Sequence, residues 1–163
     1  MSDPTPPPEA EDLLDLDRQV CFALAVAARS VIGLYRPILE PLGLTHPQYL
    51  VMLALWDQSP LTLKQIGARL SLDPATVSPL VKRLEASDLV VRDRHPHDER
   101  ALQVGLTRRG AELRTEALGV PPQIVARLGM EISELETLHG ALTRVITASR
   151  EPADVAAPIA SAT

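Results

Sequence analysis

The chain has 163 residues, of which 45% are apolar and 2% aromatic, with 15 prolines, four histidines and a single cysteine. This length suits one domain with tails, and one cysteine excludes both a disulfide framework within the chain and a zinc site built from several cysteines. The longest uninterrupted apolar run, Val20–Ala28, is far shorter than the roughly 20 residues of a membrane helix, and no charged and apolar leader precedes it. From the short apolar run and the missing leader we expect a cytoplasmic protein without a membrane anchor. Because there is also no glycine-rich phosphate loop and few residues that bind metals, we expect neither a cofactor nor a metal.

Basic residues gather in the middle of an acidic chain. The net charge is −5, yet the segment from Thr62 to Arg114 has ten basic against seven acidic residues, which leaves +3 there and −8 on the remainder. Such a division is typical of a protein with one face that meets a polyanion. Ordinary surface patterning explains the charges about equally well.

The two ends of the chain differ from its interior. Residues 1–12 and 151–163 are rich in proline or lack periodicity, so we predict disordered tails around one domain at 13–150. Apolar residues recur at helical spacing from Leu13 to Leu39, and Val20–Ala28 is apolar on every side. A helix of that kind needs cover on two faces. In so small a protein we expect another subunit to supply the second cover, through dimerisation helices at 13–42 and 123–150.

Two Thr-x-x-Gln capping boxes predict the starts of the next two helices. Thr45 opens a helix that runs through Leu50–Trp56, and Thr62 opens a short one with inward-facing Leu63, Ile66 and Leu70. Asp73 is expected to cap a third helix. Its apolar residues have the i, i+3, i+4, i+7 spacing of a buried stripe: Val77, Leu80, Val81 and Leu84. Two short helices around so brief a turn predict a helix-turn-helix at 62–87.

After Asp88 the apolar period changes from helical to two. Residues 89–94 and 101–106 are strand candidates, and the polar segment 95–100 between them is the expected tip of a hairpin, with the whole wing at 89–106. The fold class that follows is mainly α with a small β-wing, a winged helix-turn-helix. Farther along, Thr107 should cap another helix, and the prolines at 121–122 should break its helical pattern. Ser133 should then cap a final helix that runs to about Ser149.

Small and basic residues on the third helix suit a nucleic-acid groove. Its exposed positions carry short hydroxyl groups near the start and cations farther on: Thr76, Ser78, Pro79, Lys82 and Arg83. Short side chains can approach base edges in the major groove, and cations can reach phosphates. At the hairpin tip, Arg94 and Arg100 are long enough for a minor groove, and Asp98 could orient Arg100. The alternatives are a plain amphipathic helix and a solvated turn.

The tip also contains His95 and His97 next to Asp98. Three such residues without a distant fourth ligand are a weak metal motif, so we predict no metal site here.

One signature resembles a known family. Asp98-Glu99-Arg100, with Leu106-Thr107 after five further residues, resembles the D-x-R-x5-LT wing signature of the MarR family of winged-helix repressors. More narrowly, four segments look like the organic-hydroperoxide-sensing branch of that family: 19–24, 34–39, 44–52 and 73–85. The resemblance implies a homodimer that represses transcription at a dyad-symmetric operator in double-stranded DNA, upstream of a gene for a hydroperoxide-detoxifying enzyme.

The same resemblance gives a role to the single cysteine. Cys21 falls on the peroxide-sensing position of this branch, and its oxidation by an organic hydroperoxide is implied to release the operator. The reactive form is the thiolate, so hydrogen-bond donors must stand beside it. In the family these donors are tyrosines of the partner subunit; Tyr35 matches one, and His46 stands in the place of the other. With no second cysteine in the chain, the sulfenic acid must react with a low-molecular-weight thiol, another subunit or a backbone nitrogen, or oxidise further.

Three alternatives stay open. A lone cysteine on an apolar helix is otherwise an inert small hydrophobe, so the protein could be a MarR-type repressor released by a small aromatic or phenolic ligand. It could be a thiol peroxidase, although it lacks a second cysteine. It could also be an interaction module that uses a winged helix without binding DNA.

Overall fold

The computed structural model describes residues 15–95 and 98–150. It divides into two compact units, residues 1–124 and 125–163, each of which is described by itself. The predicted disordered tails and the candidate metal ligand His97 lie outside the described residues.

The first long helix, α1 (Val20–Leu39), is shorter at its start than the sequence predicts. The helix expected from Leu13 is wrong for residues 15–19, where a 3-10 turn, η2 (Leu16–Arg18), precedes α1. The carboxylate of Asp15 accepts a hydrogen bond from the backbone N–H of Asp17 at 3.0 Å, a local bond of the kind that competes with α-helix formation. Only Ile38 and Leu39 of α1 are buried.

Both predicted capping boxes are confirmed. A second 3-10 turn, η3 (Glu40–Leu42), leads to α2 (His46–Asp57). At its start the backbone N–H of Thr45 donates to Gln48 at 2.8 Å, while the Thr45 hydroxyl accepts from the Gln48 N–H. Thr62 and Gln65 repeat this arrangement at the start of α3 (Leu63–Leu70).

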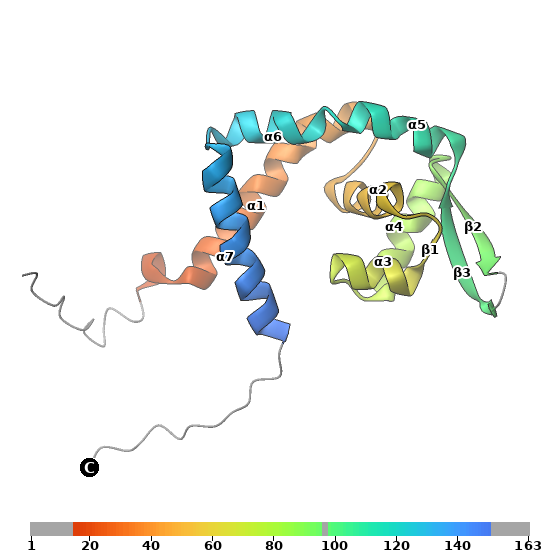
Figure 1. The fold of residues 1–163 in the computed structure, drawn as a ribbon, viewed down its shortest axis with the longest axis horizontal. Coiled ribbons are helices and arrows are strands. Elements are labelled where there is room, and N and C mark those ends of the chain that lie inside the picture. The colour runs from red at the N-terminus through yellow and green to blue at the C-terminus, as the bar shows by residue number, and fades with distance from the viewer. Residues whose placement is uncertain (1–14, 96–97, 151–163) are drawn as a thin grey trace, which may run out of the picture. The chain divides into compact units, whose positions relative to one another are not determined.

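The helix-turn-helix is completed by α4 (Pro74–Ala86), which lies close to α2 and α3 (Figure 1). Ser71, with φ of +58°, makes the turn, and Asp73 is the N-cap residue of α4. The Asp73 side chain, however, forms no capping hydrogen bond, so only the position of the expected cap is confirmed. Of the predicted stripe, Val77, Val81 and Leu84 are buried, and Leu80 is half-buried.

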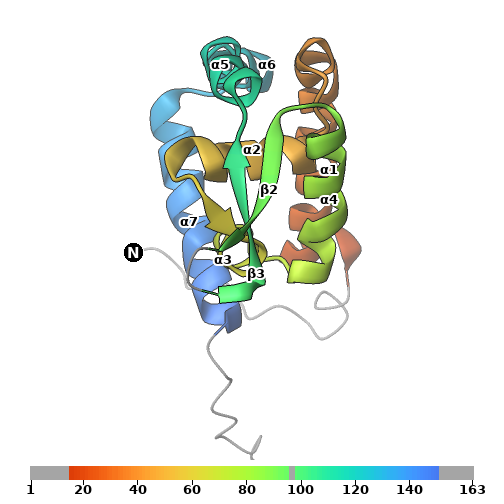
Figure 2. The ribbon, with the colours of Figure 1, turned by 90° about the vertical axis from the view of Figure 1, so that its right-hand side faces the viewer.

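The wing is an antiparallel hairpin of β2 (Val90–His95) and β3 (Asp98–Leu106). Figure 2 shows both strands with α4 beside them. A two-residue strand, β1 (Leu61–Thr62), pairs with the other edge of β3 and is too short for any period to reveal it. The strands also extend farther than predicted, so Asp98 and Arg100 belong to β3 rather than to a loop.

One apolar core joins α2, α3, α4 and the sheet. Its fully buried side chains come from all four: Val51, Met52, Leu55, Ile66, Val77, Val81, Leu84, Val90 and Val104. At Gly110 a Cβ would collide with the carbonyl oxygen of Leu89, so a residue without a side chain is needed where the next helix meets the wing. The indole N–H of Trp56 donates to the Gly110 carbonyl at 2.8 Å and ties α2 to the same point.

Two helices follow the wing. Thr107 caps α5 (Arg108–Ala117) by accepting from the Gly110 N–H, as predicted. The prolines at 121–122 do not break a helix; they lie in the first turn of α6 (Val120–Leu128), where a missing N–H costs no helical hydrogen bond. The α5 helix has already ended before them.

The second unit holds α7 (Ile132–Arg150), a helix without a buried residue. The predicted cap at Ser133 is wrong, because the helix begins one residue earlier and the N–H of Glu131 donates to the Glu134 carboxylate at 2.8 Å. Large apolar side chains are exposed along it: Ile132, Leu138, Val145 and Ile146.

Among the described residues, the segment Val20–Leu42 is long and apolar enough to cross a membrane by length and composition, with a mean hydropathy of 1.4. The expectation from the shorter apolar run missed this, because Arg29 and Arg36 interrupt the run without ending the helix. Charged side chains inside a bilayer are costly. A helix whose apolar side chains are covered by another protein surface has the same length and apolar composition.

Candidate nucleic-acid interface and thiol site

The predicted groove-reading residues lie on one helix. Of the five on α4, Thr76, Pro79, Lys82 and Arg83 are exposed and Ser78 is half-buried. The opposite side of the helix carries the buried stripe described above. This helix can therefore offer hydroxyl groups and cations to a groove without losing its packing against α2 and α3.

The predicted wing residues lie on both strands of the hairpin. Arg94 is exposed on β2 and pairs in register with Leu102 of β3. Asp98 and Arg100 lie at the start of β3, next to the tip, and their side chains are outside the described part of the structure. The backbone thus places the wing candidates at the end of the hairpin that is far from its buried base at Val90.

The cysteine and its expected hydrogen-bond donors lie at different ends of α1. Cys21 is exposed in the first turn, and Tyr35 follows fourteen residues later. At 1.5 Å per residue this separates them by about 21 Å along the helix axis. No hydrogen bond between these two side chains can therefore form within one chain.

Tyr35 does meet His46. Their ring centroids are 4.8 Å apart, and the rings are tilted by 59°. Burial lowers the pKa of His46, because an imidazolium would lose hydration there. Burial raises the pKa of Tyr35, because a phenolate would likewise lose hydration there. Both groups are therefore uncharged near neutral pH, and each retains a hydrogen to donate.

Two more aromatic rings continue from this pair. Tyr49 lies 6.0 Å from Tyr35 between centroids, and Trp56 lies 6.3 Å from Tyr49, edge to face. Burial raises the pKa of Tyr49, with a smaller contribution from Tyr35. His46, Tyr35, Tyr49 and Trp56 form what we call the aromatic row. The sequence reasoning missed Tyr49, although its position one turn after His46 on the same helix was a usable signal.

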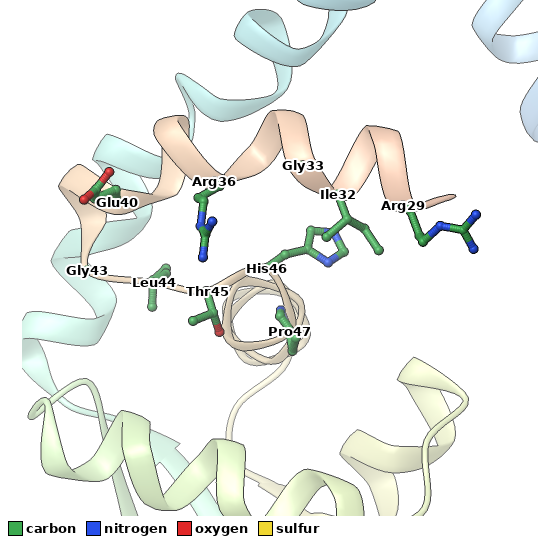
Figure 3. Close-up of a pocket in the computed structure, with 10 residues that line it drawn as sticks. All are labelled: Arg29, Ile32, Gly33, Arg36, Glu40, Gly43, Leu44, Thr45, His46 and Pro47. Atoms are coloured by element: carbon green, nitrogen blue, oxygen red, sulfur yellow. The ribbon is translucent and has the colours of Figure 1, made fainter. Parts of the chain in front are cut away.

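A cavity of about 640 Å³ opens between α1 and the start of α2. Figure 3 shows Arg36 reaching down from α1 toward Leu44 and Thr45, while the His46 ring lies beside Ile32. Arg29 lines the far end of the same cavity. Apolar walls with two arginines suit an amphipathic anion. The two arginines were not among the predicted site residues.

In the described part of the chain, no group of three or more histidine, cysteine, aspartate or glutamate residues is placed to hold an ion. The weak motif at the wing tip involves side chains outside that part.

A wing beside a groove-suited helix defines a DNA-binding regulator, and the comparisons agree. The model of the MarR family matches residues 44–102. The organic hydroperoxide resistance transcriptional regulator of Bacillus subtilis is 37% identical over 131 residues, which are 80% of this chain and 89% of that protein. The chain belongs to the MarR family of DNA-binding transcriptional regulators.

Two solved structures add detail about relatives. Reduced AbfR bound to DNA is 31% identical, with a TM-score of 0.70 over 85% of this chain and 97% of that one. BpsR of Bordetella bronchiseptica, whose DNA binding is regulated by 6-hydroxynicotinic acid, is 26% identical, with a TM-score of 0.74 over 80% of this chain and 95% of that one.

Proposed function

We propose that the protein is a homodimeric cytoplasmic repressor that releases a dyad-symmetric operator when an organic hydroperoxide oxidises Cys21. The observation that carries the proposal is an exposed, solitary cysteine in the first turn of α1. The branch-specific segments around it and the related organic hydroperoxide regulator support the same chemistry.

The 21 Å between Cys21 and Tyr35 points to a site shared by two subunits. If two copies of α1 cross antiparallel about a twofold axis, Cys21 of one copy approaches Tyr35 and His46 of the other. Apolar side chains suited to such a contact are exposed along α1: Val20, Phe22, Val26 and Ile32. A dimer would cover them and assemble two equivalent sites.

The two uncharged donors explain how a thiolate would be held. Tyr35 offers its O–H, and neutral His46 offers one ring N–H. The thiolate attacks the terminal oxygen of the hydroperoxide, the O–O bond breaks, and the alkoxide leaves and takes up a proton. The sulfenic acid that results then reacts with a low-molecular-weight thiol to give a mixed disulfide and water.

The energy needed for release favours the second step as the switch. Moving a site from 99% bound to 1% bound needs a difference of about 5.5 kcal/mol between states. A sulfenic acid alone changes a hydrogen bond or two, each contributing about 1 kcal/mol. A mixed disulfide adds a large polar group at a packed interface, so we expect weak release before the thiol reacts and full release after it.

On the DNA side, α4 of each subunit enters the major groove and the wing contacts the adjacent minor groove. In a twofold dimer the two α4 helices should lie about one DNA turn, ~34 Å, apart. Thr76, Ser78 and Pro79 would face bases, and Lys82 and Arg83 would face phosphates. Arg94, Asp98 and Arg100 would act from the wing, with Asp98 orienting Arg100.

The test uses a duplex that the wild-type protein enriches from a random-sequence library, which we call the selected duplex. Its binding is measured before and after stoichiometric organic hydroperoxide, with and without an added thiol, while mass spectrometry follows Cys21. We expect loss of binding to track the mixed disulfide in the wild type and to be absent in Cys21→Ser. Tyr35→Phe should slow oxidation and leave DNA binding intact. If Cys21 stays reduced while DNA is released, the redox mechanism fails.

A ligand-controlled repressor is the second candidate, and the cavity between α1 and α2 favours it. The volume of about 640 Å³ is ample for a small aromatic acid, and BpsR shows that regulation by such a molecule occurs on this fold. A normal response of Cys21→Ser to the effector, with Arg36→Gln impaired, would support this candidate instead.

A further inference from the structure

An ion pair connects α4 to the wing. The Nε of Arg92, on β2, donates to the Glu85 carboxylate at 2.8 Å, and a terminal guanidinium nitrogen lies 2.5 Å from the same oxygen. Glu85 lies in the last turn of α4. Both side chains are about one third exposed, 34% for Glu85 and 29% for Arg92, so the pair is partly shielded from solvent. Hydrogen bonding from Arg92 lowers the pKa of Glu85 and keeps the carboxylate charged.

The position of Glu85 is unexpected for a DNA-binding helix. Its spacing from Ser78 and Lys82 is i+7 and i+3, so it belongs to the same side of α4 as these two proposed contacts. A carboxylate on that side repels phosphate and weakens binding to any DNA. We therefore expect a contact of the Glu85 carboxylate that offsets this loss of DNA affinity.

Arg92 supplies a reason. In β2 the base of the strand is fixed by buried Val90, whereas Val91, Asp93 and Arg94 are exposed. The structure describes the side chains of β2 as far as Arg94. Among those after Val90, it is Arg92 that bonds to α4. Arg94 follows two residues later on the same face of the strand.

We propose that the Glu85–Arg92 ion pair positions the wing relative to α4, so that Glu85 and Arg92 act as positioning residues for operator recognition. This inference rests on the proposed assignment of α4 and the wing to DNA. The charge of Glu85 lowers affinity for all DNA, and the geometry it maintains raises the preference for the correct sequence.

The two contributions affect different quantities, the affinity for all DNA and the preference for one sequence, so they can be measured separately. If Glu85 acts only through its charge, Glu85→Gln raises affinity for every duplex by one factor and leaves sequence preference unchanged. If Glu85 positions the wing, Glu85→Gln lowers the ratio of affinities for the selected duplex and a shuffled duplex of equal length.

Fluorescence anisotropy with the full-length protein at ~0.15 M salt gives both affinities. We expect Glu85→Gln to reduce the affinity ratio about fivefold, the order of magnitude of a partly exposed ion pair. The matched control is Glu112→Gln, which removes the same charge from the exposed Arg108–Glu112 pair of α5 and should leave the ratio unchanged. A ratio for Glu85→Gln equal to that of Glu112→Gln overturns the proposal.

A double-variant cycle gives an independent check. Arg92→Gln should lower the affinity ratio as Glu85→Gln does, and the double variant should be no worse than either, because each substitution removes the same contact. Losses that multiply mean that the two residues act separately, and they overturn the proposal. Melting temperatures by circular dichroism verify that all variants fold. A wild-type protein that enriches no duplex refutes the proposed DNA binding itself, an outcome distinct from failure of the ion pair.

Discussion

The winged helix of residues 44–106 and the flanking helices α1 and α7 differ in how they are stabilised. In the first, α2, α3, α4 and the sheet bury their apolar side chains against one another. In the second, α1 buries only its last two residues and α7 buries none. The winged helix thus resembles a complete small domain, whereas the flanking helices expose large apolar side chains of the kind that mark interaction surfaces. The two should therefore respond differently to the same kind of substitution.

The largest effect is expected in the core of the winged helix. Leu84→Ala removes a fully buried side chain of α4 and should lower the free energy of unfolding by about 2–5 kcal/mol. Urea denaturation followed by circular dichroism measures this. The control is Leu118→Ala, the same substitution at a leucine that is 62% exposed, which should change stability by less than about 0.5 kcal/mol. Equal losses at both positions would mean that the core is not where the structure places it.

A smaller and different effect is expected on α7. Leu138→Ser alters an exposed side chain that the proposed dimer would bury, so it should weaken dimerisation by about 1–3 kcal/mol with little change in helix content. Sedimentation equilibrium across micromolar protein concentrations measures the dissociation constant. Glu136→Gln, on the same helix and exposed, serves as the control. A Leu138→Ser dimer as tight as the wild type contradicts the dimerisation role of α7.

The surface of the winged helix should tolerate change without unfolding. Lys82→Ala removes a proposed phosphate contact, so it should weaken binding to all duplexes alike and reduce the slope of log affinity against log salt by about one. Titrations at several salt concentrations measure the slope. Arg144→Ala removes a cation from exposed α7 and should leave the slope as in the wild type. An unchanged slope for Lys82→Ala would remove this residue from the interface.

The smallest effect is expected at His46, where α1 meets α2. Because burial lowers its pKa in the folded chain below 6.5, the neutral form is favoured on folding and protonation opposes it. This contribution is complete above pH 6.5 and is lost as the pH falls below it. Melting temperatures at pH 7.5 and 5.5 should therefore differ less in His46→Gln than in the wild type. His139→Gln, at an exposed histidine of α7, should keep the wild-type difference, and the opposite ranking contradicts the assignment.

Local signals predicted most of the fold, and the exceptions have local causes. The capping boxes at Thr45 and Thr62 placed two helix starts correctly, because each is a reciprocal pair of hydrogen bonds within four residues. Ser133 offered the same pattern and failed, because Glu131 and Glu134 form an equivalent bond that starts two residues earlier. The hairpin was predicted, but β1 was not, because its pairing with β3 spans some forty residues.

The candidate site divides in the same way. The α4 residues were predicted because they share one helix, and their exposure follows from the buried stripe beside them. The contacts of Arg92 with Glu85 and of Tyr35 with His46 join separate elements, so no spacing within one element reveals them. The proposed relation of Cys21 to Tyr35 and His46 is harder still to predict from spacing, because it would require a second copy of the chain.

The aromatic row gives this protein a built-in optical probe. The chain has one tryptophan and two tyrosines, and all three belong to the row. Light absorbed by Tyr35 or Tyr49 can pass by resonance transfer to Trp56, whose indole is hydrogen-bonded at the contact of α2 with α5. The tyrosine and tryptophan emission of the chain therefore originates from this row of side chains on α1 and α2. Because Tyr35 lies on α1 and Tyr49 on α2, a movement of α1 against α2 changes the distance between these two rings and hence the transfer of energy from Tyr35, which can be followed without a label.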